Sequence, residues 1–402
     1  MSGFRKTTVK SDRKLYSGLL LITSCLVGLL IAEVTLRLIH PDFYYVWPPN
    51  LEAVFTPSPT LMPGIRGESR FIINESGFRG RSFSEDDRYR ILTIGGSTTE
   101  CLYLDQSETW PQLVEELLNE ESEGSPVWVG NAGRAGHNTR HHILQIEKLL
   151  DQYPSIDLVI LLIGINDMHM RLTRDADFRP LSEEGPEDRQ MLRKRAFLVQ
   201  PGWDANYPIH KRTEIYRALR KVKERFLERN PRKEWEQYLI QDRTGSVYAK
   251  WRSHRQSAAR ILDTLPDFSA ALNEYTDNIR TIMDLAEKRN TPIVFMTQPS
   301  MWRSDLPQEL ADLLWIGGIG PYQQESGKDY YSIDALADAM EMYNSALLQV
   351  CRERTIHCVD LAALLPKDDT VFYDDVHFNE SGARKTANIL AQYLNETGLS
   401  EP

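Results

Sequence analysis

One unbroken run of apolar residues, Leu158 to Ile163, constrains the fold of this chain more than any other feature of the sequence. The run is short, with Asp157 before it and Gly164 after it. A strand with one face in water alternates apolar and polar residues, whereas a strand of a parallel sheet is covered on both faces and is apolar throughout. The run therefore predicts a buried strand of a parallel sheet that is covered on both faces.

Four other short apolar segments resemble this one, and each of the five is followed along the chain by a segment with helical spacing. The strands are expected at 91–94, 126–129, 156–163, 292–296 and 356–359. The helices are expected at 109–118, 138–150, 268–288, 333–352 and 381–394. This alternation predicts a three-layer α/β/α sandwich around a five-stranded, parallel, flavodoxin-like sheet. The polar, highly charged residues 168–265 break the rhythm, and we interpret them as a helical insertion that caps the site.

The N-terminus is expected to lie outside this fold, in a membrane. Basic residues precede an uncharged, mostly apolar run from Leu15 to Ala32, which is long enough to cross a bilayer as a helix. The position of the basic residues places the N-terminal side in the cytoplasm. The expected parts are a cytoplasmic N-terminus (1–14), an uncleaved signal anchor (15–38), a membrane-proximal linker (39–88) and an extracytoplasmic domain (89–398), periplasmic in a Gram-negative bacterium. A lipoprotein cleaved before Cys25 is the second interpretation.

The charge of the chain argues against a nucleic-acid partner. The 402 residues carry a net charge of −10, so no overall basic field exists to neutralise phosphates. A basic stretch at 211–232 is interpreted as the solvated face of a helix. Among the four cysteines, Cys351 and Cys358 are close in the sequence and could pair outside the cytoplasm, which would leave Cys101 over.

Four polar motifs stand where strands of the predicted sheet end. They are Gly95-Gly96-Ser97-Thr98, Asn131-Ala132-Gly133-Arg134-Ala135-Gly136, Gly164-Ile165-Asn166-Asp167 and Asp374-Asp375-Val376-His377. Open parallel sheets bind ligands outside the carboxyl ends of their strands, so the motifs are expected at one edge. Each motif alone has a plainer interpretation as a turn, a helix cap or a structural histidine. Together they supply a serine, a glycine, an asparagine and an Asp-x-x-His, which are the parts of an acyl-transfer site.

In these motifs and their order the chain resembles the SGNH (GDSL-type) hydrolase family. The resemblance implies that Ser97 is the nucleophile and that His377 is its general base. Asp374 would hold the imidazole and stabilise its charged form. The Asp-x-x-His spacing selects Asp374 over the neighbouring Asp375.

The same resemblance implies an oxyanion hole. Its donors would be the N–H groups of Ser97 and Gly136 and the side-chain amide of Asn166, with Gly136 preferred to Gly133. The family's Gly-Asp-Ser-Leu block is changed in this chain, where Gly96 replaces the aspartate and Thr98 the leucine. This departure places the chain in a divergent, membrane-anchored branch.

No cofactor and no metal are implied by the resemblance. His137, His141 and His142 lie close together near the Gly136 loop, but no carboxylate or cysteine stands at a matching metal-ligand spacing. His169 is expected at the mouth of the pocket. We therefore expect chemistry carried by side chains and backbone groups alone.

The sequence as a whole predicts a membrane-anchored, extracytoplasmic serine esterase that hydrolyses short-chain carboxylic esters through an acyl-enzyme. The alternative is an O-acyltransferase that acts on an exported polysaccharide, in which case Trp203, Trp235 and Trp251 could stack on sugar rings. A third interpretation is a non-catalytic binding protein on the same fold. A broken triad would favour that reading, and the motifs here are complete.

Overall fold

The computed structural model describes residues 6–39, 43–121, 126–199, 211, 213–226 and 231–401. The chain divides into two compact units. The smaller unit comprises residues 1–43 and 200–231, and the larger comprises residues 44–199 and 232–402.

The larger unit is built on a five-stranded parallel sheet, as the sequence predicts. Its strands, in spatial order, are β4 (Val127–Asn131), β3 (Tyr89–Gly95), β5 (Leu158–Leu162), β7 (Ile293–Met296) and β9 (His357–Val359). Every neighbouring pair is parallel. All five residues of β5 are buried, which explains why this run carries no polar residue.

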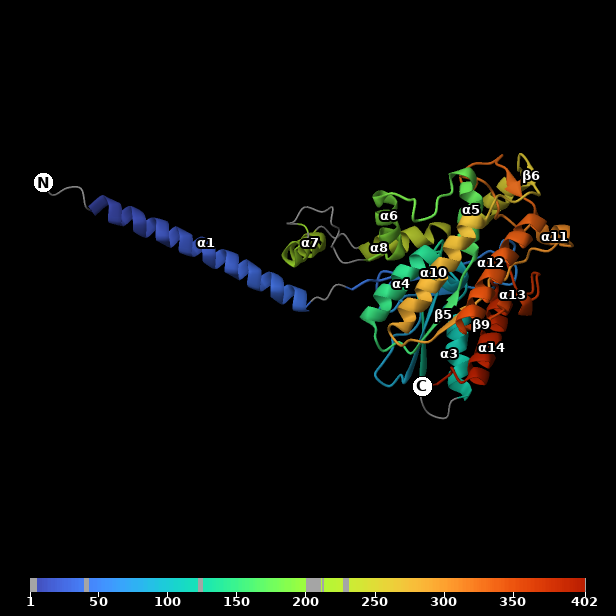
Figure 1. Cartoon of the computed structure of the whole chain (residues 1–402), viewed down its shortest axis with the longest axis horizontal. Coiled ribbons are helices and arrows are strands. Elements are labelled where there is room, and N and C mark those ends of the chain that lie inside the picture. The colour runs from blue at the N-terminus through green and yellow to red at the C-terminus, as the bar shows by residue number, and fades with distance from the viewer. Residues whose placement is uncertain are drawn as a thin grey trace. The chain divides into compact units, whose positions relative to one another are not determined.

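Helices cover both sides of the sheet (Figure 1). On one side α3 (Trp110–Glu121) packs against α14 (Glu380–Thr397). On the other side α10 (Ser269–Glu287) contacts both α4 (Thr139–Gln152) and α12 (Ile333–Arg354). The predicted three-layer, flavodoxin-like fold is therefore confirmed, and it brings the carboxyl ends of the strands to one edge.

The segment before the sheet contains structure that the sequence did not predict. β1 (Glu52–Phe55) pairs with β2 (Ser69–Ile72) in an antiparallel sheet within the larger unit. Three aromatic side chains of this segment, Phe55, Phe71 and Phe78, are completely buried. Residues 44–88 thus contribute to the core of the larger unit.

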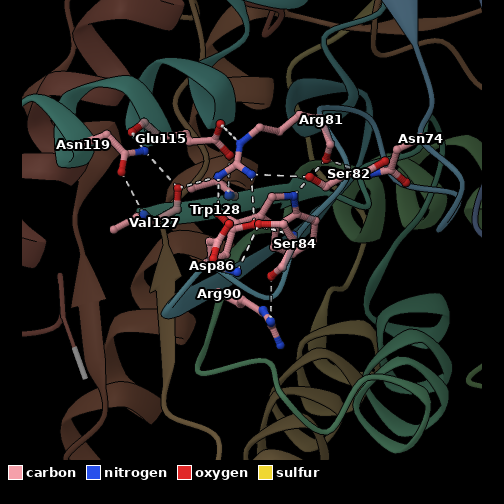
Figure 2. A network of polar contacts seen from close by, with 12 residues as sticks. Asn74, Arg81, Ser82, Ser84, Asp86, Arg90, Glu115, Asn119, Val127 and Trp128 are labelled. Carbon is pink, nitrogen blue, oxygen red and sulfur yellow. Dashed lines mark hydrogen bonds and ion pairs between the residues drawn. The ribbon is translucent and has the colours of Figure 1, made fainter. Parts of the chain in front are cut away.

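Arg81 fastens this segment to the sheet through a network of polar contacts, drawn in Figure 2. Its guanidinium pairs with both carboxylate oxygens of Asp87 at 2.7 and 2.9 Å and with Glu115 of α3 at 2.8 Å. It also donates to the carbonyl of Val127 on β4 at 3.0 Å. The indole N–H of Trp128 donates to the backbone carbonyl of Arg81 at 2.8 Å. The pKa of Asp87 is lowered: burial opposes ionisation, but the bonds from Arg81 and Ser84 outweigh it.

The stretch interpreted as an insertion is largely helical. It contains the end of α5 (Ile165–Arg174), then α6 (Pro186–Ala196), α8 (Pro231–Leu239) and α9 (Ser246–Gln256) in the larger unit. α7 (Glu214–Phe226) belongs to the smaller unit. Shorter elements complete the larger unit: α2 (Ser97–Glu100), β6 (Ile261–Leu262), α11 (Gln308–Ala311), β8 (Tyr330–Tyr331) and α13 (Leu361–Leu364).

The smaller unit contains the long helix α1 (Lys6–Ile39). Its segment Tyr16–Leu38 has 23 residues and a mean hydropathy of 2.3, so it is long and apolar enough to cross a membrane. A signal sequence at the N-terminus would meet the same criterion. Cys25 is exposed on this helix. In the larger unit Cys351 and Cys358, which the sequence left as a possible pair, form a disulfide, and Cys101 is free and buried.

Candidate active site

Ser97 is the first residue of α2, and Gly96 alone separates it from Gly95 at the end of β3. This short connection turns the chain sharply from strand to helix at the carboxyl end of the sheet. The side chain of Ser97 is partly exposed, while the three residues after it are buried. Its hydroxyl can therefore be reached from solvent although the helix behind it is packed in the core.

Three side chains from distant parts of the chain form one continuous hydrogen-bonded line. His377 Nε2 lies 2.7 Å from Ser97 Oγ, and His377 Nδ1 lies 2.7 Å from Asp374 Oδ2. Asp374 is completely buried and His377 is 8% exposed. The structure thus brings together the three residues predicted as the triad, in the order nucleophile, base and acid.

The electrostatics of this line suit a general base. Burial alone would lower the pKa of His377, but the charge and hydrogen bonds of Asp374 raise it above its usual 6.5. Burial opposes the ionisation of Asp374 as well, yet His377 and other donors hold the pKa of Asp374 below its usual range. The carboxylate therefore stays charged, and the imidazolium that forms when His377 takes a proton is stabilised.

Two tryptophans hold the aspartates of the catalytic loop. The indole Nε1 of Trp315 donates to Asp374 Oδ2 at 2.8 Å. Asp375 accepts from the indole of Trp302 at 2.8 Å and from the backbone N–H of Trp315 at 2.7 Å. Asp375 is completely buried, so its carboxylate faces away from solvent and towards this loop. The loop that carries Trp302 and Trp315 is therefore fixed to both aspartates, and only Asp374 faces His377.

Of the residues predicted as oxyanion donors, Asn166 lies against Gly96, the residue immediately before Ser97. Gly136 is exposed and has a φ of +77°. It lies in a turn in which the His137 N–H donates to the carbonyl of Arg134 at 3.1 Å. Such a backbone favours glycine because other residues are strained there. Asn166 opens α5, and its side-chain nitrogen donates to the carbonyl of His137 at 2.7 Å. An amide nitrogen carries two N–H groups, so this bond leaves a second one to point elsewhere.

At one position of the departure from the Gly-Asp-Ser-Leu block, Gly96 in place of the aspartate, a side chain lies against the backbone. A Cβ atom at Gly96 would collide with Nδ2 of Asn166. The amide of Asn166 therefore lies against the backbone immediately before Ser97, where an aspartate could not fit without moving it.

A small cavity opens beside Ser97 and His377. It measures about 10 Å³, counted as the space open to the centre of a water molecule, which suffices for one water-sized group. The walls are formed by Ser97, Thr98, Cys101, Tyr103, Leu104, Tyr373, His377 and Phe378. The ring of Tyr373 stacks on that of His377, with centroids 5.6 Å apart and planes 11° apart.

Glu100 is a buried acid near the triad that the sequence did not single out. It lies one turn after Ser97 and accepts the backbone N–H of Ala135 at 2.9 Å, next to Gly136. Burial raises the pKa of Glu100 to about 7, against the opposing charges of Arg134 and Arg79. Its position three residues after a candidate nucleophile was the available signal. The role of Trp315 had no such signal, because it stands 59 residues from Asp374.

The three histidines near Gly136 form a separate buried cluster. The rings of His137 and His141 stack with centroids 4.6 Å apart, and His142 lies next to them. Burial lowers the pKa of all three, that of His141 and His142 to about 3. Among the described residues no group of three or more His, Cys, Asp or Glu side chains is placed to hold a metal ion.

The described aromatic and histidine candidates, Trp235, Trp251 and His169, do not line this cavity. The ring of Trp251 packs against Trp315, with centroids 4.5 Å apart, and Trp235 is partly buried against the core. Trp203 lies outside the described residues. His169 is partly buried and bonds the hydroxyl of Tyr322 at 2.6 Å. Trp251 thus supports the loop that holds the triad, and we assign it no contact with sugar.

The comparisons with known proteins agree with this geometry. The model of the GDSL-like lipase/acylhydrolase family matches residues 93–385, a range that contains Ser97, Gly136, Asn166, Asp374 and His377. No curated protein matches the chain.

Several solved structures are similar to the chain at low identity. A putative lipolytic protein of the G-D-S-L family from Desulfitobacterium hafniense DCB-2 is 9% identical, with a TM-score of 0.36, over 75% of this chain and 98% of that one. An acetylxylan esterase from Geobacillus stearothermophilus is 15% identical, with a TM-score of 0.39, over 78% and 97%. An alpha/beta hydrolase enzyme from the metagenome of Lake Arreo, Spain, is 12% identical, with a TM-score of 0.40, over 79% and 98%. These similarities say nothing about the substrate of this chain.

Proposed function

Since the chain belongs to the GDSL-like lipase/acylhydrolase family and is an ester-bond hydrolase, we propose that Ser97, His377 and Asp374 are its catalytic triad. The observation that carries the proposal is the line of hydrogen bonds at 2.7 Å from Ser97 Oγ through the imidazole to the buried carboxylate. A serine hydroxyl is a weak nucleophile until a base removes its proton, and this line supplies the base.

The proposed reaction has two steps. In the first, Ser97 Oγ attacks the ester carbonyl while His377 Nε2 takes the hydroxyl proton, which it then gives to the leaving alcohol. In the second, His377 takes a proton from water while the water oxygen attacks the acyl carbon, the bond to Ser97 Oγ breaks, and His377 returns the proton to Ser97 as the free acid is released. In both steps the negative oxygen would lie among the N–H groups of Ser97, Gly136 and Asn166.

The acyl group is proposed to be short, with acetyl as the best fit. The cavity beside Ser97 has room for one water-sized group, and a methyl group is about that size. A longer chain would have to displace Leu104 or Phe378, both of which are buried. Moving packed side chains costs free energy, so the rate of acylation should fall as the acyl chain grows.

We also propose that the protein is anchored in the cell membrane by α1, with the catalytic unit on the extracytoplasmic side. The support is the apolar segment Tyr16–Leu38, none of which is buried within the structure, and the basic residues that precede it in the sequence. The Cys351–Cys358 disulfide is consistent with an oxidising compartment.

The test is hydrolysis of p-nitrophenyl esters with two-, four- and eight-carbon acyl chains by the full-length protein in detergent. We expect turnover that is fastest with acetate and is lost in Ser97→Ala, while Ser345→Ala, which removes an exposed hydroxyl from α12, keeps it. A fluorophosphonate should label Ser97 and no other serine. Turnover that survives in Ser97→Ala would overturn the triad, and a preference for the longest ester would overturn the acyl assignment.

The O-acyltransferase alternative is decided by the acceptor. An acetylated product formed from an added polysaccharide, at the expense of free acetate and still dependent on Ser97, would show transfer by the same acyl-enzyme. The half-exposed Ser97 and exposed Gly136 admit water to this site, so hydrolysis is the reaction that we propose.

A further inference from the structure

The smaller unit contains a contact between the apolar helix α1 and the basic helix α7. Both carboxylate oxygens of Glu33 on α1 accept N–H groups from the start of α7. The Glu214 N–H donates to Oε1 at 3.0 Å, and the Ile215 N–H donates to Oε2 at 3.1 Å. The first N–H groups of a helix have no partner within the helix, so Glu33 caps α7 from outside it.

The position of Glu33 in α1 determines where the first turn of α7 lies relative to the apolar segment. Glu33 lies within the apolar segment Tyr16–Leu38, five residues before its end, or about 7 Å along the helix axis. A carboxylate at this depth of a bilayer is costly unless it is paired. Arg37, one turn further on, supplies one partner at 2.8 Å, and the backbone of α7 supplies the other two. The first turn of α7 is therefore attached close to one end of the expected membrane span.

α7 has the composition of a helix that lies on a membrane. Its apolar residues Ile215, Leu219 and Val222 follow the spacing of one helical face, and Leu219 and Val222 are 64% and 52% exposed. Basic residues outnumber acidic ones in α7 by five to two, although the whole chain is acidic. The basic residues are Arg217, Arg220, Lys221, Lys223 and Arg225.

We propose that α7 lies in the interface of the membrane that α1 crosses, with Leu219 and Val222 in the lipid and its basic residues among anionic phospholipid headgroups. The proposal rests on the membrane anchoring proposed above. Two observations select lipid as the occupant of the apolar face: α7 is capped by a residue of the span itself, and its charge is opposite to that of an anionic bilayer surface.

The same contact bears on the two alternatives for α1. Two alternatives are removal of α1 as a signal sequence after export and cleavage of the chain before Cys25. They would affect the α1–α7 contact differently. Removal of α1 takes away the acceptor of the α7 amides, whereas cleavage before Cys25 keeps Glu33 in place. The α1–α7 contact therefore favours a chain that retains Glu33. In such a chain α7, which belongs to the 168–265 insertion, makes a second contact with the membrane.

The experiment places a fluorescent label on each face of α7 in the full-length protein. Single cysteines are introduced as Leu219→Cys on the apolar face and Arg220→Cys on the polar face, both with Cys25→Ser. Of the native cysteines, Cys101 is buried and the other two are joined in a disulfide. Each labelled protein is reconstituted in phosphatidylcholine vesicles with and without phosphatidylglycerol, and quenching by aqueous iodide is compared with quenching by nitroxide-bearing lipids.

We expect the label at 219 to be quenched by the lipids and shielded from iodide, the label at 220 to show the reverse, and the contrast to be larger with phosphatidylglycerol. Equal access of iodide to both labels would overturn the proposal. So would a label at 219 that neither quencher reaches, because a protein surface would then cover it. Glu33→Leu should reduce the lipid quenching at 219, whereas Glu33→Gln, which keeps an acceptor oxygen, should largely preserve it.

The outcome is separable from the other proposals. Flotation of the vesicles reports whether the chain is membrane-bound at all, and ester hydrolysis on the same samples reports the activity. A protein that floats and hydrolyses esters but exposes both labels to iodide contradicts only the placement of α7.

Discussion

The larger unit buries two sets of histidines, and they differ in the charge that faces them. His377 bonds the carboxylate of Asp374 at 2.7 Å. His137 and His141 stack on each other, and the nearby charged side chains are arginines, with Arg134 next to both rings and Arg195 and Arg140 also acting on His141. Burial lowers the pKa of an imidazole in both places, yet the pKa of His377 is raised and that of the others is lowered.

This comparison shows that burial does not make a general base. A buried imidazole with no carboxylate stays neutral and packs like an aromatic ring, as the stacked rings of the cluster do. A buried imidazole that faces a carboxylate can hold a proton, which a base must do in the course of the reaction. The predictions below change the charge or the donors around each set, from the largest expected effect to the smallest.

The largest effect is expected from Asp374→Asn, which makes the surroundings of His377 resemble those of the cluster. An amide cannot stabilise the imidazolium and favours the wrong tautomer, so kcat for p-nitrophenyl acetate should fall by about 10³- to 10⁴-fold. The melting temperature checks that the variant is folded. A folded variant that keeps a tenth of the activity would mean that the carboxylate does not account for the difference between His377 and the histidine cluster.

Asn166 connects the histidine cluster with the turn before Ser97, because its amide bonds the carbonyl of His137 and lies against Gly96. Asn166→Ala tests this residue. Loss of an oxyanion donor should lower kcat by about 10²- to 10³-fold and change KM little, because the bond is strongest in the transition state. Steady-state kinetics with p-nitrophenyl acetate separates the two constants. A raised KM with an unchanged kcat would show that Asn166 only binds substrate.

Part of this arrangement could be predicted from the sequence. The strands were recognisable because a strand covered on both faces must be apolar, as β5 is. The position of Ser97 follows from a motif at the end of a strand. The His377 motif was expected at a strand end as well, but it stands beyond α13 in the structure, so it was its Asp-x-x-His spacing that made it recognisable. β1 and β2 were missed because both are short and lie in a segment rich in proline and glycine, where alternation is hard to recognise.

The supports of the site could not be predicted, because they depend on contacts between distant segments. Trp315 meets Asp374 across 59 residues, and a tryptophan in a sequence does not show what its N–H group will bond. The basic character of α7 was visible in the sequence and was interpreted as a solvated face. The contact with Glu33, across 181 residues, is what suggests another role.

A smaller effect is expected from Trp315→Phe, which removes the N–H donor from Asp374 and keeps most of the ring. A hydrogen bond to a charged group contributes about 1.5–3 kcal/mol, and we expect about half of this in the transition state, or a fall in kcat of roughly tenfold. Trp302→Phe is the matched control, since its indole bonds Asp375. It should lower the melting temperature similarly and leave kcat within about threefold. Equal losses of kcat would assign Trp315 a purely structural role.

The smallest effect concerns pH. His377 must be neutral to accept a proton, and its pKa is raised, so kcat/KM should rise with pH through one ionisation above 6.5. Burial lowers the pKa of His377, and the negative charges of Asp374, Asp375 and Glu100 oppose this effect. Burial raises the pKa of Glu100 to about 7, so Glu100 is only partly charged over the range where His377 titrates. Glu100→Gln can still accept the N–H of Ala135 but removes this charge, so the inflection should move down by at most roughly half a pH unit.

His141→Gln is the control for this shift, because it alters the cluster and not the charges around His377. The pKa of His141 is lowered to about 3, so it carries no charge in the range where activity changes. Its removal should cost stability, by roughly 1–2 kcal/mol, and leave the inflection of kcat/KM where it was. The measurement is a pH profile of p-nitrophenyl acetate hydrolysis for the two variants and the parent protein. An inflection that moves with His141→Gln would mean that the two sets of histidines are electrostatically coupled. An inflection that stays fixed with Glu100→Gln would mean that the charge of Glu100 does not act on His377.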